Sequence, residues 1–236
     1  MVQNSDWLDS IKFKVKKKPR LYKFLIEVIS PVFYFKKSSY QKIFRYLDPK
    51  ENIIVNIGSG PFRLHDNIIN IDISDYTNVD LIANAKKLPL KNESVDGIIN
   101  VVSLEHINNP ELVMDEFYRL LKPGGYIYTA LPFIAGYHAS PHDYKRWTIS
   151  GIKNLHNKFS EQEVNVFGGP TSGLVWILTE WLALLLSFRI LPLYKALFIL
   201  FTLILWPLKF LDILLINHPM SNNIASSFYY IGMKKT

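Results

Sequence analysis

The sequence predicts an α/β fold: a doubly wound, seven-stranded and mostly parallel sheet, interrupted by a hydrophobic helical insertion. Three observations lead to this prediction. From residue 51 onward, short runs rich in β-branched residues alternate with helix-like patterns, which is typical of βαβ units. Hydrophobic residues make up 49% of the chain, which is ample for one large core. A block near the C-terminus carries few charges, and a regular strand pattern returns after it.

Seven segments have the length and composition of strands, and two others have helical patterns. The clearest helix is predicted over Pro110–Leu121, because Asn109 can cap it, Pro110 suits its first turn, and the segment KPGG ends it. A second helix is expected after Thr148 and up to about residue 157. The expected strands are 53–57, 68–73, 79–83, 95–100, 126–131, 163–167 and 227–232.

The first two expected strands enclose a glycine turn and end close to polar residues. Gly58 and Gly60 follow the first strand, and Asp72 lies at the end of the second. Glycines at this place let a ligand approach the backbone, and a carboxylate there can accept both hydroxyls of a ribose. Arg63 replaces the further glycine of dinucleotide sites, which disfavours NAD. Only ten residues separate the strands, so we expect loop and strand ends, without a full helix, to hold a nucleoside.

Six segments, in order and spacing, resemble those of class I S-adenosylmethionine-dependent methyltransferases of the type 11-like group. They are VNIGSG, NIDIS, NAKKLPLKNESVDGII, VVSLEHI, LLKPGG and PHDYKRWT. The resemblance covers about residues 50–170 and the last strand, and it implies a Rossmann-like fold with S-adenosyl-L-methionine as cofactor. Asn56 stands where many members carry an acid, and Asn84 replaces the usual aspartate. The cofactor-binding residues that the resemblance implies are Asn56, Gly58, Ser59, Gly60, Asp72, Ile73, Asn84, Ala85, Ser103 and Leu104.

Histidines near the ends of the fourth and fifth expected strands are candidates for acid–base chemistry. A hydroxyl acceptor benefits from a general base, and histidine suits this role at neutral pH. The predicted catalytic residues are His106, His138, His142 and Asp143. The alternative is a structural role, in which the loop histidines bind backbone groups and His106 lines the cofactor pocket. No metal is predicted, because Pro141 disfavours helical ligand spacing in the loop and the chain has no cysteine.

Residues 1–50 are predicted to form a basic, amphipathic arm. They contain twelve Lys and Arg against four acids, a net charge of +8, whereas the remainder carries 15 − 16 = −1. Aromatic residues interleave with these cations, as in segments that lie on anionic lipid headgroups. A nucleic-acid partner is disfavoured because the rest of the chain offers no second basic patch. A solvated charged tail is the other alternative.

Residues 173–216 form the predicted insertion, which carries only five charges in 44 residues. Pro192 and Pro207 divide it, and Ala196–Leu208 is its longest uncharged run after Glu180. Those thirteen residues fall short of the roughly 20 needed to span a bilayer, so we expect short helices with a hairpin that dips into one leaflet. An intramolecular or dimeric core and a pair of tilted spans are the alternatives. The methyltransferase domain is then predicted over 51–172 and 217–236.

Together these features predict a methyltransferase at the cytoplasmic side of a membrane, attached as a peripheral or monotopic protein. The predicted reaction is O-methylation of a membrane-associated acceptor: a lipid-linked saccharide, a glycan precursor or a lipid. The alternative function is a non-catalytic, membrane-bound binding or scaffold protein with the same fold. The anionic membrane surface is an expected partner, and the oligomeric state stays open.

Overall fold

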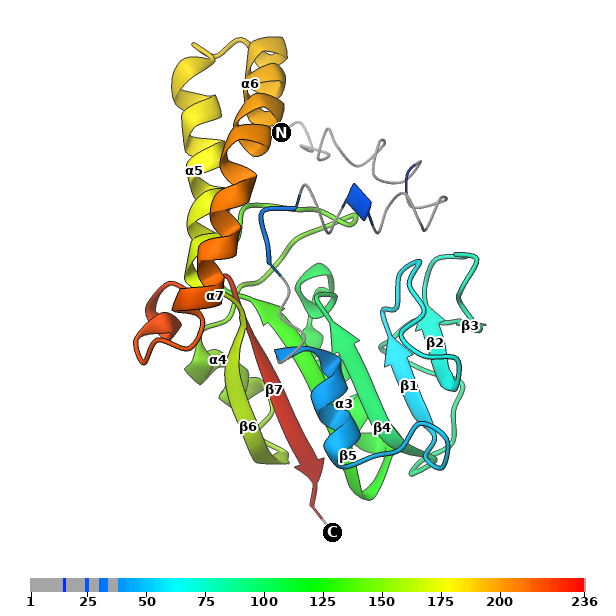
Figure 1. Cartoon of the computed structure of the whole chain (residues 1–236). Coiled ribbons are helices and arrows are strands. Elements are labelled where there is room, and N and C mark those ends of the chain that lie inside the picture. The colour runs from blue at the N-terminus through cyan, green and yellow to red at the C-terminus, as the bar shows by residue number, and fades with distance from the viewer. Residues whose placement is uncertain (1–14, 16–23, 26–29, 34–37, 236) are drawn as a thin grey trace.

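The computed structural model describes residues 15, 24–25, 30–33 and 38–235. Seven strands form one sheet in the order β3-β2-β1-β4-β5-β7-β6 (Figure 1). Strand β7 runs antiparallel to β5 and β6, and the other neighbouring strands are parallel. The predicted fold class is therefore confirmed. The strands are β1 (Ile54–Ile57), β2 (Ile68–Asp72), β3 (Leu81–Ile82), β4 (Val95–Val101), β5 (Leu121–Pro132), β6 (Phe159–Gly168) and β7 (Ser227–Lys234).

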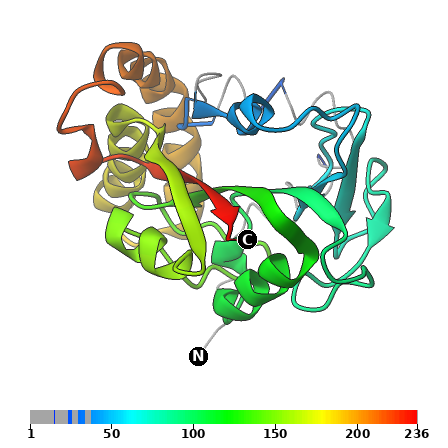
Figure 2. The ribbon, with the colours of Figure 1, turned by 90° about the horizontal axis from the view of Figure 1, so that it is seen from below.

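Both faces of the sheet are covered, and successive strand residues alternate between them. Helices α3 (Pro110–Leu120) and α4 (Ile149–Leu155) lie on one face, and the 3-10 helix η2 (Tyr40–Arg45) lies on the other (Figure 2). Ile98 packs in the α3 core, whereas its neighbour Ile99 packs in the η2 core. This period of two is the one that β-strands impose on their side chains. Burial on both faces explains the uninterrupted apolar runs of the central strands.

Several element bounds differ from the prediction for local reasons. Strand β5 begins at Leu121, immediately after α3, so the segment KPGG lies inside the strand where a stop was expected. A register shift between Val95 and Gly97 on the neighbouring strand accommodates it. Asn109 takes the left-handed conformation, with φ of +65°, and its side chain makes no capping hydrogen bond, contrary to the prediction. Asparagine tolerates this region better than other non-glycine residues. Thr148 does cap α4 by accepting from the Gly151 N–H.

The predicted arm lies largely outside the described residues, but its C-terminal part packs on the sheet. Ile43 on η2 is fully buried in the second core. Lys42 forms an ion pair with Glu163 on β6, and Arg45 lies 3.5 Å from the same carboxylate. These two cations are therefore paired within the domain. The arm boundary predicted at residue 50 lies too far along the chain, since η2 belongs to the folded body.

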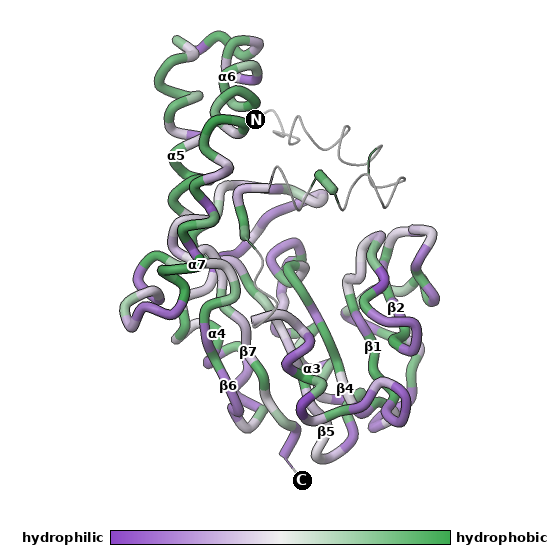
Figure 3. Tube along the Cα trace, viewed as in Figure 1, coloured by the Kyte–Doolittle hydropathy of each residue, from purple (hydrophilic) through white to green (hydrophobic). Residues whose placement is uncertain are grey.

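The insertion is a helical hairpin that rises from the sheet beyond the carboxyl end of β6 (Figure 1). Hydrophobic residues cover most of its length (Figure 3). Together its second helix and the turns after it, Leu191–Leu215, form a 25-residue apolar stretch long enough to cross a membrane. Pro207 does not end this stretch, because proline is tolerated in the first turn of a helix. The helices are α5 (Pro170–Leu186), α6 (Leu191–Leu205), η4 (Trp206–Leu211) and α7 (Asp212–Leu215), and η3 (Leu104–His106) and η5 (Ser221–Asn223) are short 3-10 turns elsewhere.

The base of the hairpin is fixed to the body by a buried carboxylate. Asp212 is fully buried and accepts hydrogen bonds from the N–H groups of Thr171 and Ser172, at 2.6 and 2.9 Å. These are the free N–H groups of the first turn of α5, where a negative charge is favourable. A Cβ at Gly169 would lie 2.3 Å from this carboxylate, so glycine is required there. The root of the hairpin is thus part of the folded domain, three residues before the predicted start at 173.

Candidate active site

A cavity of about 2800 Å³ opens at the carboxyl ends of β1, β2 and β4 and continues along the hairpin. At one end it is lined by the glycine turn and Asp72, and at the other by Tyr194 and Phe198 of α6. Open α/β sheets bind ligands at this edge, where the strand order reverses between β1 and β4. Pockets for one small molecule measure roughly 300–1,000 Å³, so this cavity has room for a cofactor and an acceptor.

The glycine turn after β1 has the backbone geometry that the sequence pattern predicts. Gly58 and Gly60 have φ angles of +72° and +56°, which L-residues rarely adopt. The Gly58 N–H donates to the Ile71 carbonyl at 2.8 Å, which ties the turn to β2. A Cβ at Gly58 would lie 2.5 Å from the Ser103 hydroxyl, so no other residue fits there without displacing the loop after β4.

Asp72 lies beside this turn at the end of β2 and borders the cavity. Its Oδ2 accepts from the Gly60 N–H at 2.8 Å, and its Oδ1 accepts from the Ser74 N–H at 2.9 Å. Each oxygen keeps further acceptor capacity, because an ionised carboxylate can accept about four hydrogen bonds. The two backbone bonds therefore fix a carboxylate at the cavity wall that is still able to bind a pair of hydroxyls.

Asn56 is buried beneath the turn and bonds to a residue that the sequence analysis missed. Its Nδ2 donates to Oδ1 of Asn70, its register partner on β2, at 3.1 Å. Asn70 in turn donates to the carbonyls of Phe62 and Asn78. Asn56 borders the cavity, but its amide N–H serves this network. The cross-strand pairing of two asparagines was the signal that could have identified Asn70.

A second polar pair lies under the loop that follows β4. Asn100 donates to the Ile57 carbonyl at 2.8 Å and to the Ser103 hydroxyl, while its own Oδ1 is buried without a hydrogen-bond partner among the described residues. Val102 has a φ of +50°, a strained conformation for a β-branched residue, and such strain gathers at functional sites. Ser103 lines the cavity as predicted, whereas Leu104 is fully buried in the core.

The predicted adenine side of the pocket lies after β2 and β3. Ile73 is 69% exposed and borders the cavity, as do Asn84 and Ala85. The Asn84 Oδ1 accepts from the Lys86 N–H at 3.0 Å, which fixes the orientation of its amide. An exposed isoleucine at a cavity wall is a suitable apolar surface for a base, so the adenine-binding role of these residues stays a prediction.

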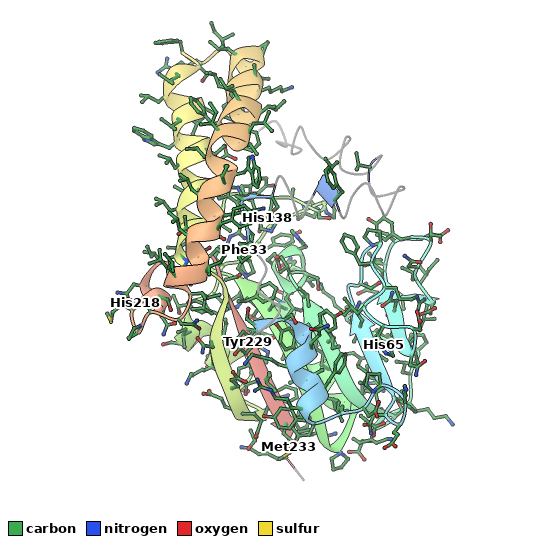
Figure 4. The ribbon with its side chains drawn as sticks, viewed as in Figure 1. Phe33, His65, His138, His218, Tyr229 and Met233 are labelled. Carbon is green, nitrogen blue, oxygen red and sulfur yellow. The ribbon has the colours of Figure 1, made fainter. Side chains whose placement is uncertain are left out.

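The loop after β5 holds His138 below the hairpin (Figure 4). There His138 lies at the cavity edge beside two residues of η3, Glu105 and His106. The His138 Nε2 lies 3.4 Å from Oε1 of Glu105, and the His106 Nε2 lies 3.9 Å from the same atom. Burial lowers the pKa of His106, although the Glu105 charge and the His142 carbonyl oppose this effect. The sequence analysis predicted both histidines but missed Glu105.

The other two predicted catalytic residues have different positions. The His142 side chain is exposed, and its carbonyl oxygen accepts from the His106 Nδ1–H at 2.7 Å. The Asp143 carboxylate accepts from Arg146 and from the His138 N–H. Burial opposes its ionisation, but these hydrogen bonds hold the pKa of Asp143 below its usual range. Asp143 and Arg146 thus shape the loop that positions His138.

Helix α5 contacts this loop directly. The Trp176 ring lies 5.1 Å from the His138 ring, measured between centroids. A Cβ at Gly136 would lie 2.3 Å from the Trp176 Nε1, so the indole packs against bare backbone. The Gly136 carbonyl lies 3.0 Å from the His138 Nδ1. The hairpin therefore forms part of the wall around the loop after β5.

Comparisons with known proteins agree with this architecture. A family model described as a methyltransferase domain matches residues 60–129. A methyltransferase structure from Thermotoga maritima, described as a possible histamine N-methyltransferase, is 16% identical over 94% of this chain and 98% of its own, with a TM-score of 0.53. The 1,6-didemethyltoxoflavin-N1-methyltransferase of Burkholderia thailandensis is 10% identical over 96% of this chain and 87% of its own, with a TM-score of 0.56. No curated protein matches the chain.

At these identities the structural likeness establishes the fold alone. The [4+2]-cyclase SpnF has it too, at 12% identity, a TM-score of 0.52 and coverage of 96% of this chain and 95% of its own. The strand order, the antiparallel β7 and the glycine turn define the class I methyltransferase fold. The chain therefore has the fold of class I S-adenosylmethionine-dependent methyltransferases, and residues 60–129 match a methyltransferase domain.

The residues at the sheet edge fit this cofactor. The glycine turn leaves a cradle that a side chain would fill, and Asp72 presents a fixed carboxylate to it. The buried Asn100 Oδ1 is an unused acceptor under the same turn. Asp72 would hold the ribose, residues 58–60 the methionyl part, and Ile73 with Ala85 the adenine.

Proposed function

We propose that this enzyme O-methylates an acceptor carried by a membrane lipid, at the cytoplasmic face of the membrane, with a lipid-linked saccharide as the first candidate. The observation that carries the proposal is the continuity of the cavity from the glycine turn to the hairpin. A cavity that joins the cofactor end to an apolar hairpin suits an acceptor whose polar head reacts while its apolar part stays in lipid.

The surface of the hairpin supports a position in one leaflet. Helix α6 has no buried residue. Large apolar side chains on both helices are more than half exposed, such as Leu203 on α6 and Leu185 on α5. At about 1.5 Å per residue its fifteen residues span about 22 Å, less than the ~30 Å of a hydrocarbon core. The further residues to Leu215 include Asp212, which is bound to the body. An apolar patch of this extent on a soluble protein marks an interaction site.

The charged residues of the hairpin support the direction in which the acceptor would enter. Between residues 173 and 205 these are Glu180, Arg189 and Lys195, and all three border the cavity. The Glu180 carboxylate accepts from the Tyr194 hydroxyl at 2.6 Å. Charged groups set among apolar residues on the cavity side would let a lipid-borne head group pass along the hairpin toward the loop after β5.

In this function the chain chiefly aligns two bound molecules. When bound, S-adenosylmethionine supplies an activated methyl group. Asp72 and the glycine turn would hold the donor in place, and Trp176 with the loop after β5 would exclude water on the acceptor side. Proximity and orientation of this kind supply roughly 7–11 kcal/mol of rate acceleration. The cluster of Glu105, His106 and His138 stands at the cavity edge, where the hydroxyl proton of the acceptor would be released.

The proposal is tested by methyl transfer from radiolabelled S-adenosylmethionine to a lipid extract, to soluble sugars and to nucleic acid. We expect label in the organic phase, and none with the Asp72→Ala variant. Mild acid, which releases saccharides from lipid pyrophosphate carriers, would then move the label to the aqueous phase. Label that appears only in nucleic acid or only in free sugars would contradict the proposal.

A further inference from the structure

Glu105 is a buried carboxyl group whose two oxygens the described part of the fold leaves without hydrogen bonds. Its side chain is fully buried on η3, and neither oxygen has a hydrogen-bond partner in the described part of the chain. Other buried carboxylates of the molecule are bonded: Asp212 accepts three hydrogen bonds, and Asp143 binds Arg146. Burying a charge is costly unless it is paired or coordinates a metal. Glu105 therefore requires a positive partner.

The two histidines beside Glu105 present lone pairs to it. The His106 Nδ1 lies 2.7 Å from the His142 carbonyl oxygen, which can only accept, so Nδ1 carries the proton. The His138 Nδ1 lies 3.0 Å from the Gly136 carbonyl oxygen. Arg146 also approaches that Nδ1, at 3.3 Å, but both hydrogens of its Nη2 are used by Gly136 and Asp143. With Nδ1 donating to a backbone carbonyl in each ring, Nε2 is the ring atom that faces the Glu105 carboxyl group.

We propose that Glu105, His106 and His138 form a binding site for one divalent transition-metal ion, of which Zn²⁺ is the representative. The three ligand atoms lie within 4.8 Å of one another. Neighbouring ligands of a tetrahedral ion with bonds of ~2.1 Å are about 3.4 Å apart. The distances from Oε1 of Glu105 to the two Nε2 atoms are 3.4 and 3.9 Å, close to this spacing. Two imidazoles and one carboxylate are a set that zinc and ferrous iron use in catalytic sites.

A protonated His138 paired directly with Glu105 is the competing explanation. Charge-assisted N–H···O bonds measure about 2.7–2.9 Å, whereas this pair is 3.4 Å apart. A direct pair would also leave the Nε2 of His106 without a role. The backbone bonds that hold both Nδ1 atoms are, by contrast, the second contacts that orient metal-bound histidines.

The metal would serve the acceptor, a role that rests on the proposed function. Three protein ligands leave a fourth position free, and both histidines line the cavity. A hydroxyl oxygen of the acceptor bound there would have a lowered pKa, so its proton would pass to water in the open cavity. The sequence analysis weighed a metal site made of His138, His142 and Asp143 and predicted none. The structure instead brings His138 beside Glu105 and His106.

The test is metal binding by the full-length, tag-free protein in detergent after removal of metals with a chelator. Titration with Zn²⁺ alone, followed by calorimetry, should show one saturable site per chain. Titration with Co²⁺ should give visible absorption bands typical of a four- or five-coordinate ion. We expect Glu105→Gln and His138→Gln to weaken Zn²⁺ binding by at least about tenfold. The matched control is His142→Gln, which removes a loop histidine whose ring is outside the site and should keep the affinity.

Three outcomes would overturn the proposal: no saturable binding, equal weakening by His142→Gln, or unchanged affinity in Glu105→Gln. If Glu105→Gln fails to fold, as shown by its circular dichroism spectrum, His106→Gln and His138→Gln decide, because both side chains are partly exposed. Binding is measured without cofactor or acceptor. Metal binding without methyl transfer to lipid would therefore count against the proposed function alone, and methyl transfer without metal binding would count against this inference alone.

Discussion

The sheet edge at β1 and β2 and the hairpin of α5 and α6 border one cavity but are stabilised in different ways. At the sheet edge, buried polar groups bond to one another over short turns, as Asn56, Asn70 and Asp72 do. Along the hairpin, apolar side chains are exposed on α6, and charges occur only toward the cavity. The geometry of the sheet edge is set by hydrogen bonds within the protein. The stability of the exposed hairpin surface depends on the medium that surrounds it.

The largest expected effect comes from breaking the sheet edge at Gly58. Gly58→Ala should lower affinity for S-adenosylmethionine at least a hundredfold and destabilise the fold, because its Cβ would meet Ser103 at 2.5 Å. Gly124→Ala is the matched control: Gly124 has a similar φ of +77°, and nothing lies within 4 Å of its Cβ. The control should lose only about 1–2 kcal/mol of stability for the left-handed backbone. Calorimetric titration measures the affinity for S-adenosylmethionine, and thermal unfolding measures the stability of each variant. Equal behaviour of the two variants would contradict the close packing.

The second effect removes the hairpin and leaves the sheet edge intact. Replacing residues 181–201 with a short glycine-rich turn keeps the root at Asp212 and the contact of Trp176 with the loop. We expect this variant to lose binding to anionic vesicles in a flotation assay, while its affinity for S-adenosylmethionine stays within about threefold of the wild type. Vesicle binding that survives the deletion would place the membrane contact elsewhere.

The third effect concerns a buried histidine in the other half of the sheet. His156 donates to the Ile152 carbonyl and accepts from Thr129, and burial lowers its pKa from 6.5 to about 4. The unfolded chain therefore binds its proton more tightly, so unfolding free energy falls as pH drops from 6.5 toward 4. The loss is about 3 kcal/mol at pH 4. Denaturant unfolding between pH 6.5 and 4 should show that the unfolding free energy of the wild type falls more steeply with decreasing pH than that of His156→Gln. Parallel curves would contradict it.

The smallest effect is a single exposed position on the hairpin. Leu185→Ser should weaken vesicle binding by about 1–2 kcal/mol, because one buried leucine contributes that much when transferred from water to lipid. Stability in detergent should stay within about 0.5 kcal/mol, since Leu185 is 55% exposed and surface changes are usually neutral. Ala183→Ser, at a fully buried position of the same helix, gives the contrast: it should affect stability more than binding.

The sequence predicted the features that depend on local pattern. Gly58 and Asp72 were predicted because each directly follows or ends a strand that the local pattern reveals, and neighbouring parallel strands bring such ends together. Glu105 and His138 were not paired in advance, because they are 33 residues apart and meet only when the loop after β5 folds back on η3. Asn70 was missed because its role depends on register, which a single strand does not reveal. The length of the helical stretch to Leu215 was underestimated because Pro207 was taken as a break.

The contact of Trp176 with Gly136 couples the hairpin to the loop after β5. No methyl group fits between the indole and the loop backbone, and the carbonyl of that glycine holds the imidazole of His138. A tilt of α5 at its N-terminal end would therefore displace the His138 imidazole as well. The position of α5 and that of the His138 imidazole are thus coupled through direct contacts.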